Sequence, residues 1–292
     1  MARQYAMQLM CWNVQWCRGV DGRVDPQRIA RTVRALADPD VVCLQEVARG
    51  FDTLAGSAGE DQFALLAAEF AGWTAIEGIA VDVPRPGGGR RQFGNLLLSR
   101  LRVQQAWRHL LPWPADADHA DMQRVAVEAV IEVPPDSGIG PLRVTCTHLA
   151  YYSAAQRLAQ CDALRAQHAA ACAHAIAPAR ADDSQGPFQW HARPTAGIVC
   201  GDFNCEPGSP GHQRMLEPFA DGTPAFEDAW ALVHRGRSHD PTVGLYDSVQ
   251  WPRRFACDFA FVSQDLAPRV RSLAVDAGSD ASDHQALILD LV

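Results

Sequence analysis

Short apolar runs recur along the whole chain, and such runs are typical of buried β-strands. A strand is expected wherever several apolar residues follow one another between turn-forming residues. These runs occupy residues 7–14, 40–44, 93–99, 125–133, 142–147, 197–200, 255–262, 269–275 and 286–291. We therefore expect roughly nine to twelve strands, spread over the whole length.

Three longer segments carry apolar residues at helical spacing. The first begins at Asp25, a typical capping residue, with Pro26 at the first helical position. The others cover residues 61–70 and residues 153–175. Strands and helices alternate throughout, and no linker separates two compositions. The pattern predicts a single domain over residues 1–292, with two sheets and helices outside them.

Residues 178–194 interrupt this pattern because they have no periodicity. A structureless segment of this length is unusual inside a compact domain. We interpret it as a mobile loop, with a lid over a binding site as the alternative.

Length and composition are those of a globular protein. The 292 residues are 48% hydrophobic and 21% charged, so the chain can bury a large core without disulfides or a structural metal. Lys and Arg number 26 and Asp and Glu 34, giving a net charge of −8. This charge excludes a uniformly basic, nucleic-acid-coating surface but not a local basic rim.

Features that would indicate a membrane or an oxidising compartment are missing from the sequence. No stretch approaches the ~20 apolar residues that cross a bilayer. Residues 1–9 lack the apolar segment of a secretory signal. The nine cysteines are scattered and form no Cys-x-x-Cys pair. We therefore predict a cytoplasmic protein with reduced thiols, no membrane association and no obligate protein partner.

Polar residues stand at the ends of several predicted strands. A single one would be interpreted as a turn residue or a helix cap. Their recurrence is typical of a functional site, because a rigid sheet positions such residues on its loops. The residues are Asn13, Glu46, His148, Asp202, Asn204, Asp258, Asp283 and His284. Asp258 lies within a predicted buried strand and therefore needs a partner.

Three cysteines support the same geometry. Cys11, Cys146 and Cys200 each precede one of these polar residues by two positions. Residues two apart share one face of a strand, so the cysteines are expected to pack beneath the site. A catalytic thiol is not expected, because no activating base stands beside any of them.

Six short motifs occur in the order found in one family. They are Trp12-Asn13-Val14, Leu44-Gln45-Glu46-Val47, the run from Gly94 to Arg100, Thr147-His148-Leu149, Gly201-Asp202-Phe203-Asn204 and Ser282-Asp283-His284. Over residues 8–291 the chain resembles the endonuclease/exonuclease/phosphatase family, whose members are DNase I-like or exonuclease III-like. The resemblance implies a four-layer α/β/β/α sandwich of two mixed sheets flanked by helices. It also implies Mg²⁺- or Mn²⁺-dependent hydrolysis of a phosphoester at the rim between the sheets.

The resemblance assigns the metal to oxygen-bearing residues, which Mg²⁺ prefers. Glu46 is the implied principal ligand, with Asn13 beside it and Asp283 as a second or water-positioning ligand. Asp202 is the implied residue that orients or deprotonates the attacking water.

The remaining implied roles concern the phosphate. Asn204 would hydrogen-bond the phosphate, and His148 would contact it or protonate the leaving group. His284 would stabilise the developing charge as an imidazolium. Asp258 would hold its other ring nitrogen and raise its pKa.

Substrate contacts are less closely defined. Arg124 precedes a strand at a place where the family often has an arginine, either structural or phosphate-facing, and Asn95 is a further candidate. The family's arginine before the dyad aspartate is replaced here by Ala256, so Arg254 is the candidate substitute. Trp251 could stack on a base. The arginines of residues 85–91 and 251–254 either form a basic rim or are only solvated.

We therefore predict a phosphodiesterase or nuclease acting on nucleic-acid or nucleotide-like phosphodiesters. One alternative is a phosphomonoesterase or a lipid-headgroup or inositol-phosphate hydrolase of the same fold. An alternative of another class is a catalytically silent binding scaffold, which the complete set of polar residues disfavours.

Overall fold

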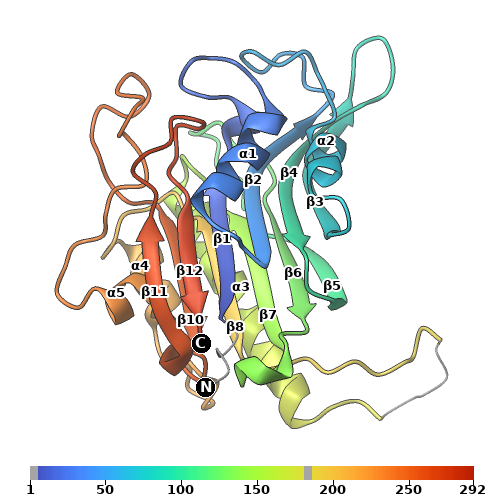
Figure 1. The fold of residues 1–292 in the computed structure, drawn as a ribbon, viewed down its shortest axis with the longest axis vertical. Coiled ribbons are helices and arrows are strands. Elements are labelled where there is room, and N and C mark those ends of the chain that lie inside the picture. The colour runs from blue at the N-terminus through green and yellow to red at the C-terminus, as the bar shows by residue number, and fades with distance from the viewer. Residues whose placement is uncertain (1–5, 181–185) are drawn as a thin grey trace.

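A computed structural model describes residues 6–180 and 186–292, in which two six-stranded sheets pack face to face (Figure 1). The strands of the first sheet are β1 (Met7–Asn13), β2 (Val41–Arg49), β3 (Thr74–Pro84), β4 (Arg90–Ser99), β11 (Val270–Val275) and β12 (Leu287–Leu291). Its order is β11-β12-β1-β2-β4-β3. The strands of the second sheet are β5 (Val103–Leu110), β6 (Val125–Ile131), β7 (Leu142–His148), β8 (Gly197–Asp202), β9 (Phe226–Asp228) and β10 (Asp258–Ser263). Its order is β5-β6-β7-β8-β10-β9.

Helices cover the outer face of each sheet. On the first sheet lie α1 (Pro26–Leu36) and α2 (Gln62–Glu69), and on the second lie α3 (Ala154–Ile176) and α4 (Pro210–Leu216). A short helix, α5 (Ala229–Val233), follows β9. The predicted cap is present, since the Asp25 side chain accepts a hydrogen bond from the Arg28 backbone. The expected four-layer α/β/β/α sandwich is confirmed.

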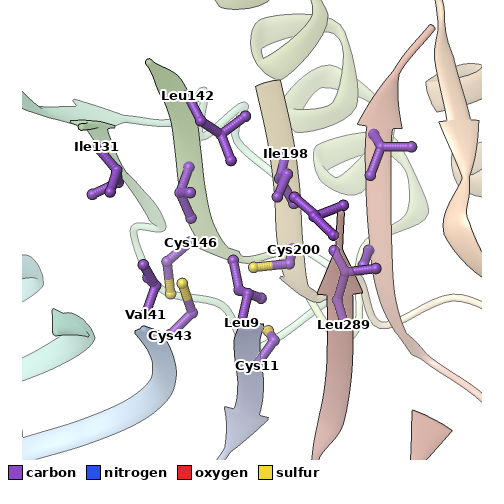
Figure 2. Packing of buried hydrophobic residues seen from close by; sticks show 14 of the residues in the cluster. Leu9, Cys11, Val41, Cys43, Ile131, Leu142, Cys146, Ile198, Cys200 and Leu289 are labelled. Carbon is purple, nitrogen blue, oxygen red and sulfur yellow. The ribbon is translucent and has the colours of Figure 1, made fainter. Parts of the chain in front are cut away.

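Strand alternation divides the apolar side chains of the first sheet between two clusters, one between the sheets and one under the helices. On β1, Leu9 and Cys11 face the second sheet, whereas Met10 and Trp12 face the helices. Figure 2 shows the cysteines of four central strands among branched aliphatic side chains between the sheets; they are Cys11, Cys43, Cys146 and Cys200. Burial raises the pKa of the Cys11 and Cys43 thiols well above the ordinary value, so these thiols act as packing groups.

The sheet topology brings one end of several strands together. The pairs β1–β2 and β7–β8 are parallel, so their carboxyl ends lie at the same end of each sheet. The antiparallel neighbours β10 and β12 begin at that end. One rim, toward the top of Figure 1, therefore contains the carboxyl ends of β1, β2, β7 and β8 and the first residues of β10 and β12.

The predicted strands are all present in the structure, with two differences. Three strands were not predicted individually, and each of them, β3, β5 and β9, is the edge of a sheet. Edge strands are half exposed, so their apolar pattern is weak. The strand predicted over residues 255–262 begins only at Asp258, because Thr242 Oγ1 accepts the backbone N–H groups of Cys257 and Asp258.

Within the loop predicted over residues 178–194, the described parts 178–180 and 186–194 contain no helix or strand. Residues 181–185 lie outside the described residues. No helix in the described ranges is both long enough and apolar enough to span a membrane.

Candidate functional site

A cavity of about 550 Å³ opens at the rim where these strand ends meet. Its lining combines polar strand-end residues with aromatic and aliphatic ones. The polar lining residues are Gln15, Glu46, Arg124, His148, Asp202, Asn204, Gln250, Asp283 and His284. The rest are Trp16, Phe51, Leu54, Val81, Phe93, Met122, Tyr151, Tyr152 and Trp251.

Glu46, His148 and Asp202 form the centre of the polar group. Their nearest ligand atoms all lie within 4.8 Å of one another, although they come from both sheets. Glu46 has a φ of 61° at a bulge in β2, which turns its side chain out of the strand's regular alternation. Burial, with the charge of Asp283, raises the pKa of Glu46 to about 7. Burial, with the charge of Asp258, raises that of Asp202 to about 6.

The side chain of Asn13 lies between the two carboxylates. Its Nδ2 donates to Glu46 Oε1 at 2.9 Å and to Asp202 Oδ2 at 3.0 Å. Its Oδ1 accepts the Gln15 backbone N–H at 3.1 Å. Because the amide oxygen is used by the backbone, Asn13 holds the two carboxylates together through its nitrogen.

His284 and Asp258 form the predicted pair. His284 Nδ1 lies 2.9 Å from Asp258 Oδ2, and its Nε2 lies 3.8 Å from Asp202 Oδ2. Burial alone would lower the pKa of His284, but the charges of Asp258, Asp283 and Asp202 raise it well above its ordinary value. The raised pKa favours the imidazolium form of the ring. His284 lines the cavity, and Asp258 orients the ring by holding Nδ1.

His148 has the opposite electrostatic character. Burial, with the charges of Arg124 and His284, lowers its pKa well below the ordinary value. Its Nε2 lies 3.1 Å from Asn204 Nδ2 and 3.5 Å from Asp202 Oδ2. Asn204 follows β8 with a φ of 50°, and its Nδ2 also donates to the Leu149 carbonyl. One neutral and one charged histidine thus flank Asp202.

Arg124 is buried at the cavity, with only 7% of its surface exposed. Its Nε and Nη1 have no hydrogen-bond partner in residues 6–180 and 186–292, and the guanidinium forms no ion pair there. Burial lowers its pKa, against the opposing influence of Glu46 and Asp202. A buried cation without a partner is costly, and a bound anion would compensate it.

Asp283 is held by three donors on its two oxygens. Gln15 Nε2 and Trp251 Nε1 each donate to its Oδ2 at 2.9 Å, and Ser282 Oγ lies 3.3 Å from its Oδ1. Trp251 is therefore largely buried with its indole N–H occupied, and it lines the cavity. Gln15 was not predicted; its position just after Asn13 was the only signal in the sequence.

Two predicted substrate contacts lie elsewhere. Asn95 is buried in β4, and its Nδ2 donates to the Val125 carbonyl at 2.8 Å, so it ties the two sheets together. Arg254 is exposed and does not line the cavity. Arginines of the expected basic rim have local partners, because Arg85 pairs with Asp52 and Arg253 with Glu206.

The donor set suits a divalent cation that prefers oxygen. Glu46 and Asp202 are buried carboxylates whose pKa values are raised by burial and like charge, only partly offset by His284 and Asn13, and a cation would relieve this. Glu46 and Asp202 would hold such an ion, with the neutral ring of His148 beside them.

Comparisons with known proteins identify the family of the chain. The family model described as "Endonuclease/Exonuclease/phosphatase family" matches residues 10–284. No curated protein sequence matches the chain significantly.

Solved structures match over nearly the whole chain. An endonuclease/exonuclease/phosphatase from Beutenbergia cavernae is 25% identical, with a TM-score of 0.66, over 99% of this chain and 72% of that one. The human Nocturnin catalytic domain with bound sulfate is 21% identical, with a TM-score of 0.61, over 100% and 94%. A mannosyl-6-phosphatase from Bacteroides thetaiotaomicron is 15% identical, with a TM-score of 0.58, over 98% and 99%.

The family model spans most of the chain, and these structures share its two-sheet fold. Family members are generally phosphoester hydrolases that use divalent metals. The chain belongs to the endonuclease/exonuclease/phosphatase family.

Proposed function

We propose that this protein is a metal-dependent phosphodiesterase that acts on nucleotide-like phosphodiesters by in-line attack of water. The observation that carries the proposal is the buried, unpaired guanidinium of Arg124 beside the Glu46–His148–Asp202 cluster. A phosphodiester carries one negative charge near neutral pH, and a single guanidinium matches it. The apolar part of the cavity lining favours ester substituents over a second anionic oxygen.

Each residue has a role that its contacts support. Asp202 orients the attacking water or accepts its proton, a role that fits its place between His148 and His284 in the polar group. Arg124 binds a phosphate oxygen, and Asn204 holds the ring of His148 in place through its Nδ2. His284, held by Asp258, stabilises the charge that develops as water attacks. His148 is neutral and assists the leaving group as a hydrogen-bonding partner.

Mg²⁺ or Mn²⁺ bound by Glu46 and Asp202 would polarise the phosphate and lower the pKa of a bound water. Asn13 keeps the two carboxylates in place. Asp283 positions the neighbouring His284 backbone through its bonds to Gln15 and Trp251. We further propose that the protein acts in the cytoplasm without a membrane or an obligate protein partner.

The proposal is tested with bis(p-nitrophenyl) phosphate and p-nitrophenyl phosphate, each with Mg²⁺, Mn²⁺ or EDTA. We expect metal-dependent release of nitrophenolate, faster from the diester. Asp202→Asn should lower kcat about 10²- to 10⁴-fold, the usual contribution of a general base. The matched control is Asp136→Asn, an exposed aspartate away from the cavity, which should leave kcat unchanged.

Three outcomes would contradict the proposal. Faster hydrolysis of the monoester would indicate a phosphatase, as in the mannosyl-6-phosphatase with the same fold. Full activity in EDTA would exclude the metal. Absence of hydrolysis of both esters and of a panel of dinucleotides and short oligonucleotides would favour a binding scaffold.

A further inference from the structure

Two exposed tyrosines stand at the mouth of the cavity. Tyr151 and Tyr152 lie in the loop that follows β7, after Leu149 and Ala150, and are 46% and 59% exposed. Their rings meet edge to face, with centroids 4.6 Å apart, and Tyr151 also meets Trp251 edge to face at 5.9 Å. Large exposed aromatic side chains beside a reactive centre commonly bind a planar ligand.

A second cavity of about 280 Å³ is also lined by the two tyrosines. It shares Met122, Arg124, Tyr151 and Tyr152 with the first cavity. Because Arg124 borders both, a phosphate bound there has one ester substituent directed to the reactive cluster and room for the other in the second cavity.

Gln156, which lines the second cavity, has a buried side-chain oxygen without a hydrogen-bond partner among the described residues. Gln156 is fully buried, and its Nε2 donates to the Pro114 carbonyl and to Asp121 Oδ2. Its Oε1 has no partner among the described residues. A ring N–H or an exocyclic amine would satisfy this oxygen, whereas a hydrocarbon chain would not.

The charges around the rim disfavour a long nucleic-acid strand. Arg85 and Arg253 are paired with Asp52 and Glu206, so they offer no free row of cations for successive phosphates. A small ligand needs only the guanidinium of Arg124.

We infer that the cavity bounded by Met122, Tyr152 and Gln156 binds the nucleobase of a small nucleotide ester whose phosphate lies at Arg124. This inference rests on the proposed function for the place of the phosphate. It adds a specificity site, which would make Tyr152 and Gln156 substrate-binding residues.

The test is a binding measurement that does not require turnover. Isothermal titration in Mg²⁺ compares the methyl phosphodiesters of adenosine 5′-monophosphate and of ribose 5-phosphate, of which the second lacks the base. We expect the nucleotide to bind about tenfold more tightly, in the range of one base–aromatic stack. Tyr152→Leu should remove most of this preference. It should change the Kd of the ribose 5-phosphate ester, which has no base, less than about twofold. Tyr152→Phe keeps the aromatic ring and should retain the preference.

Phe188→Leu is the matched control, because Phe188 is an aromatic side chain, 83% exposed, that lines neither cavity. It should bind both ligands like the wild type. Equal affinity for the two ligands, no binding of either at millimolar concentration, or an unchanged preference in Tyr152→Leu would overturn the inference. A preference for the nucleotide without any ester hydrolysis would support the nucleobase site and reject the proposed function. Ester hydrolysis without this preference would support the proposed function and reject the nucleobase site.

Discussion

Arg124 illustrates how a functional residue departs from the rules of a stable interior. Another arginine, Arg143, is equally buried, but it lies 3.5 Å from Glu128 and donates to the Pro194 carbonyl. Arg124 has no comparable partner in the described part of the chain. An unpaired buried charge destabilises the folded state, so its presence at the cavity indicates a role in binding an anion.

We predict opposite effects for methionine at these two positions. Arg124→Met should raise KM for bis(p-nitrophenyl) phosphate at least about tenfold, the loss of a charged hydrogen bond, without lowering the melting temperature. Arg143→Met is the matched control: it removes one cation beside Glu128 and the hydrogen bonds to the Pro194 and Thr195 carbonyls, so it should lower the melting temperature with little change in KM. An Arg124→Met protein that melts far below the wild type would mean that this guanidinium is structural.

At the scale of elements, backbone strain gathers where the strands end. The non-glycine residues with positive φ in the described ranges all lie next to the cavity: Gln15, Trp16 and Cys17 after β1, Glu46 in β2 and Asn204 after β8. Such conformations are unfavourable and persist where the surrounding structure holds them. Here they direct Gln15, Glu46 and Asn204 into the site.

A second histidine–carboxylate cluster joins β9, α4 and a loop away from the cavity. Asp228 Oδ2 lies 2.9 Å from His212 Nε2 and 2.7 Å from His239 Nε2. The Gly208 backbone N–H donates to His212 Nδ1, so the ring proton is on Nε2 and faces Asp228. This geometry is that of a hydrogen-bonded carboxylate, not of a metal ligand set.

This cluster gives a prediction for stability against pH. Burial would raise the pKa of Asp228, but the hydrogen bonds from His212 and His239 lower it far below the ordinary value. The lowered pKa stabilises the fold above the unfolded value of about 4, and this contribution is lost as the pH falls below it. Asp228→Asn should therefore cost about 2 kcal/mol at pH 7 and less at pH 3, measured by urea unfolding.

The exposed Asp240 supplies the control, since Asp240→Asn should unfold like the wild type at both pH values. An Asp228→Asn protein that loses equal stability at pH 7 and pH 3 would show that the charge of Asp228 does not matter.

At the scale of the molecule, the site joins the two sheets. Glu46 belongs to β2 of the first sheet and Asp202 to β8 of the second. An ion held by both carboxylates binds only when the sheets are packed together, so it stabilises the whole fold.

We therefore predict a metal-dependent melting temperature. Mn²⁺ at about 100 times its Kd should raise it by roughly 5–10 °C, from about 2.7 kcal/mol of added stability. Glu46→Gln should abolish most of this rise, and Glu132→Gln, which is exposed and far from the cavity, should not. A rise that Glu46→Gln leaves intact would place the ion elsewhere.

Much of this architecture is visible in the sequence because it depends on local pattern. Central strands such as β1 and β8 are apolar on both faces, and helix α1 has its cap and its stripe, so both kinds of element are predictable. The edge strands β3 and β5 are not, because solvent on one side permits polar residues there. The polar residues at the strand ends were identifiable because burying a polar side chain is costly unless it has a partner.

What the sequence by itself determined is the order of the elements, the chemistry of Glu46, His148, Asp202 and His284, and the family resemblance of their motifs. Only the tertiary structure decided which atoms of these residues meet. The Asn13 amide turns its nitrogen to the carboxylates, the Trp251 indole binds Asp283, and Arg124 lies buried without a partner. Each of these depends on contacts between segments far apart in the chain, which side-chain type and spacing do not specify.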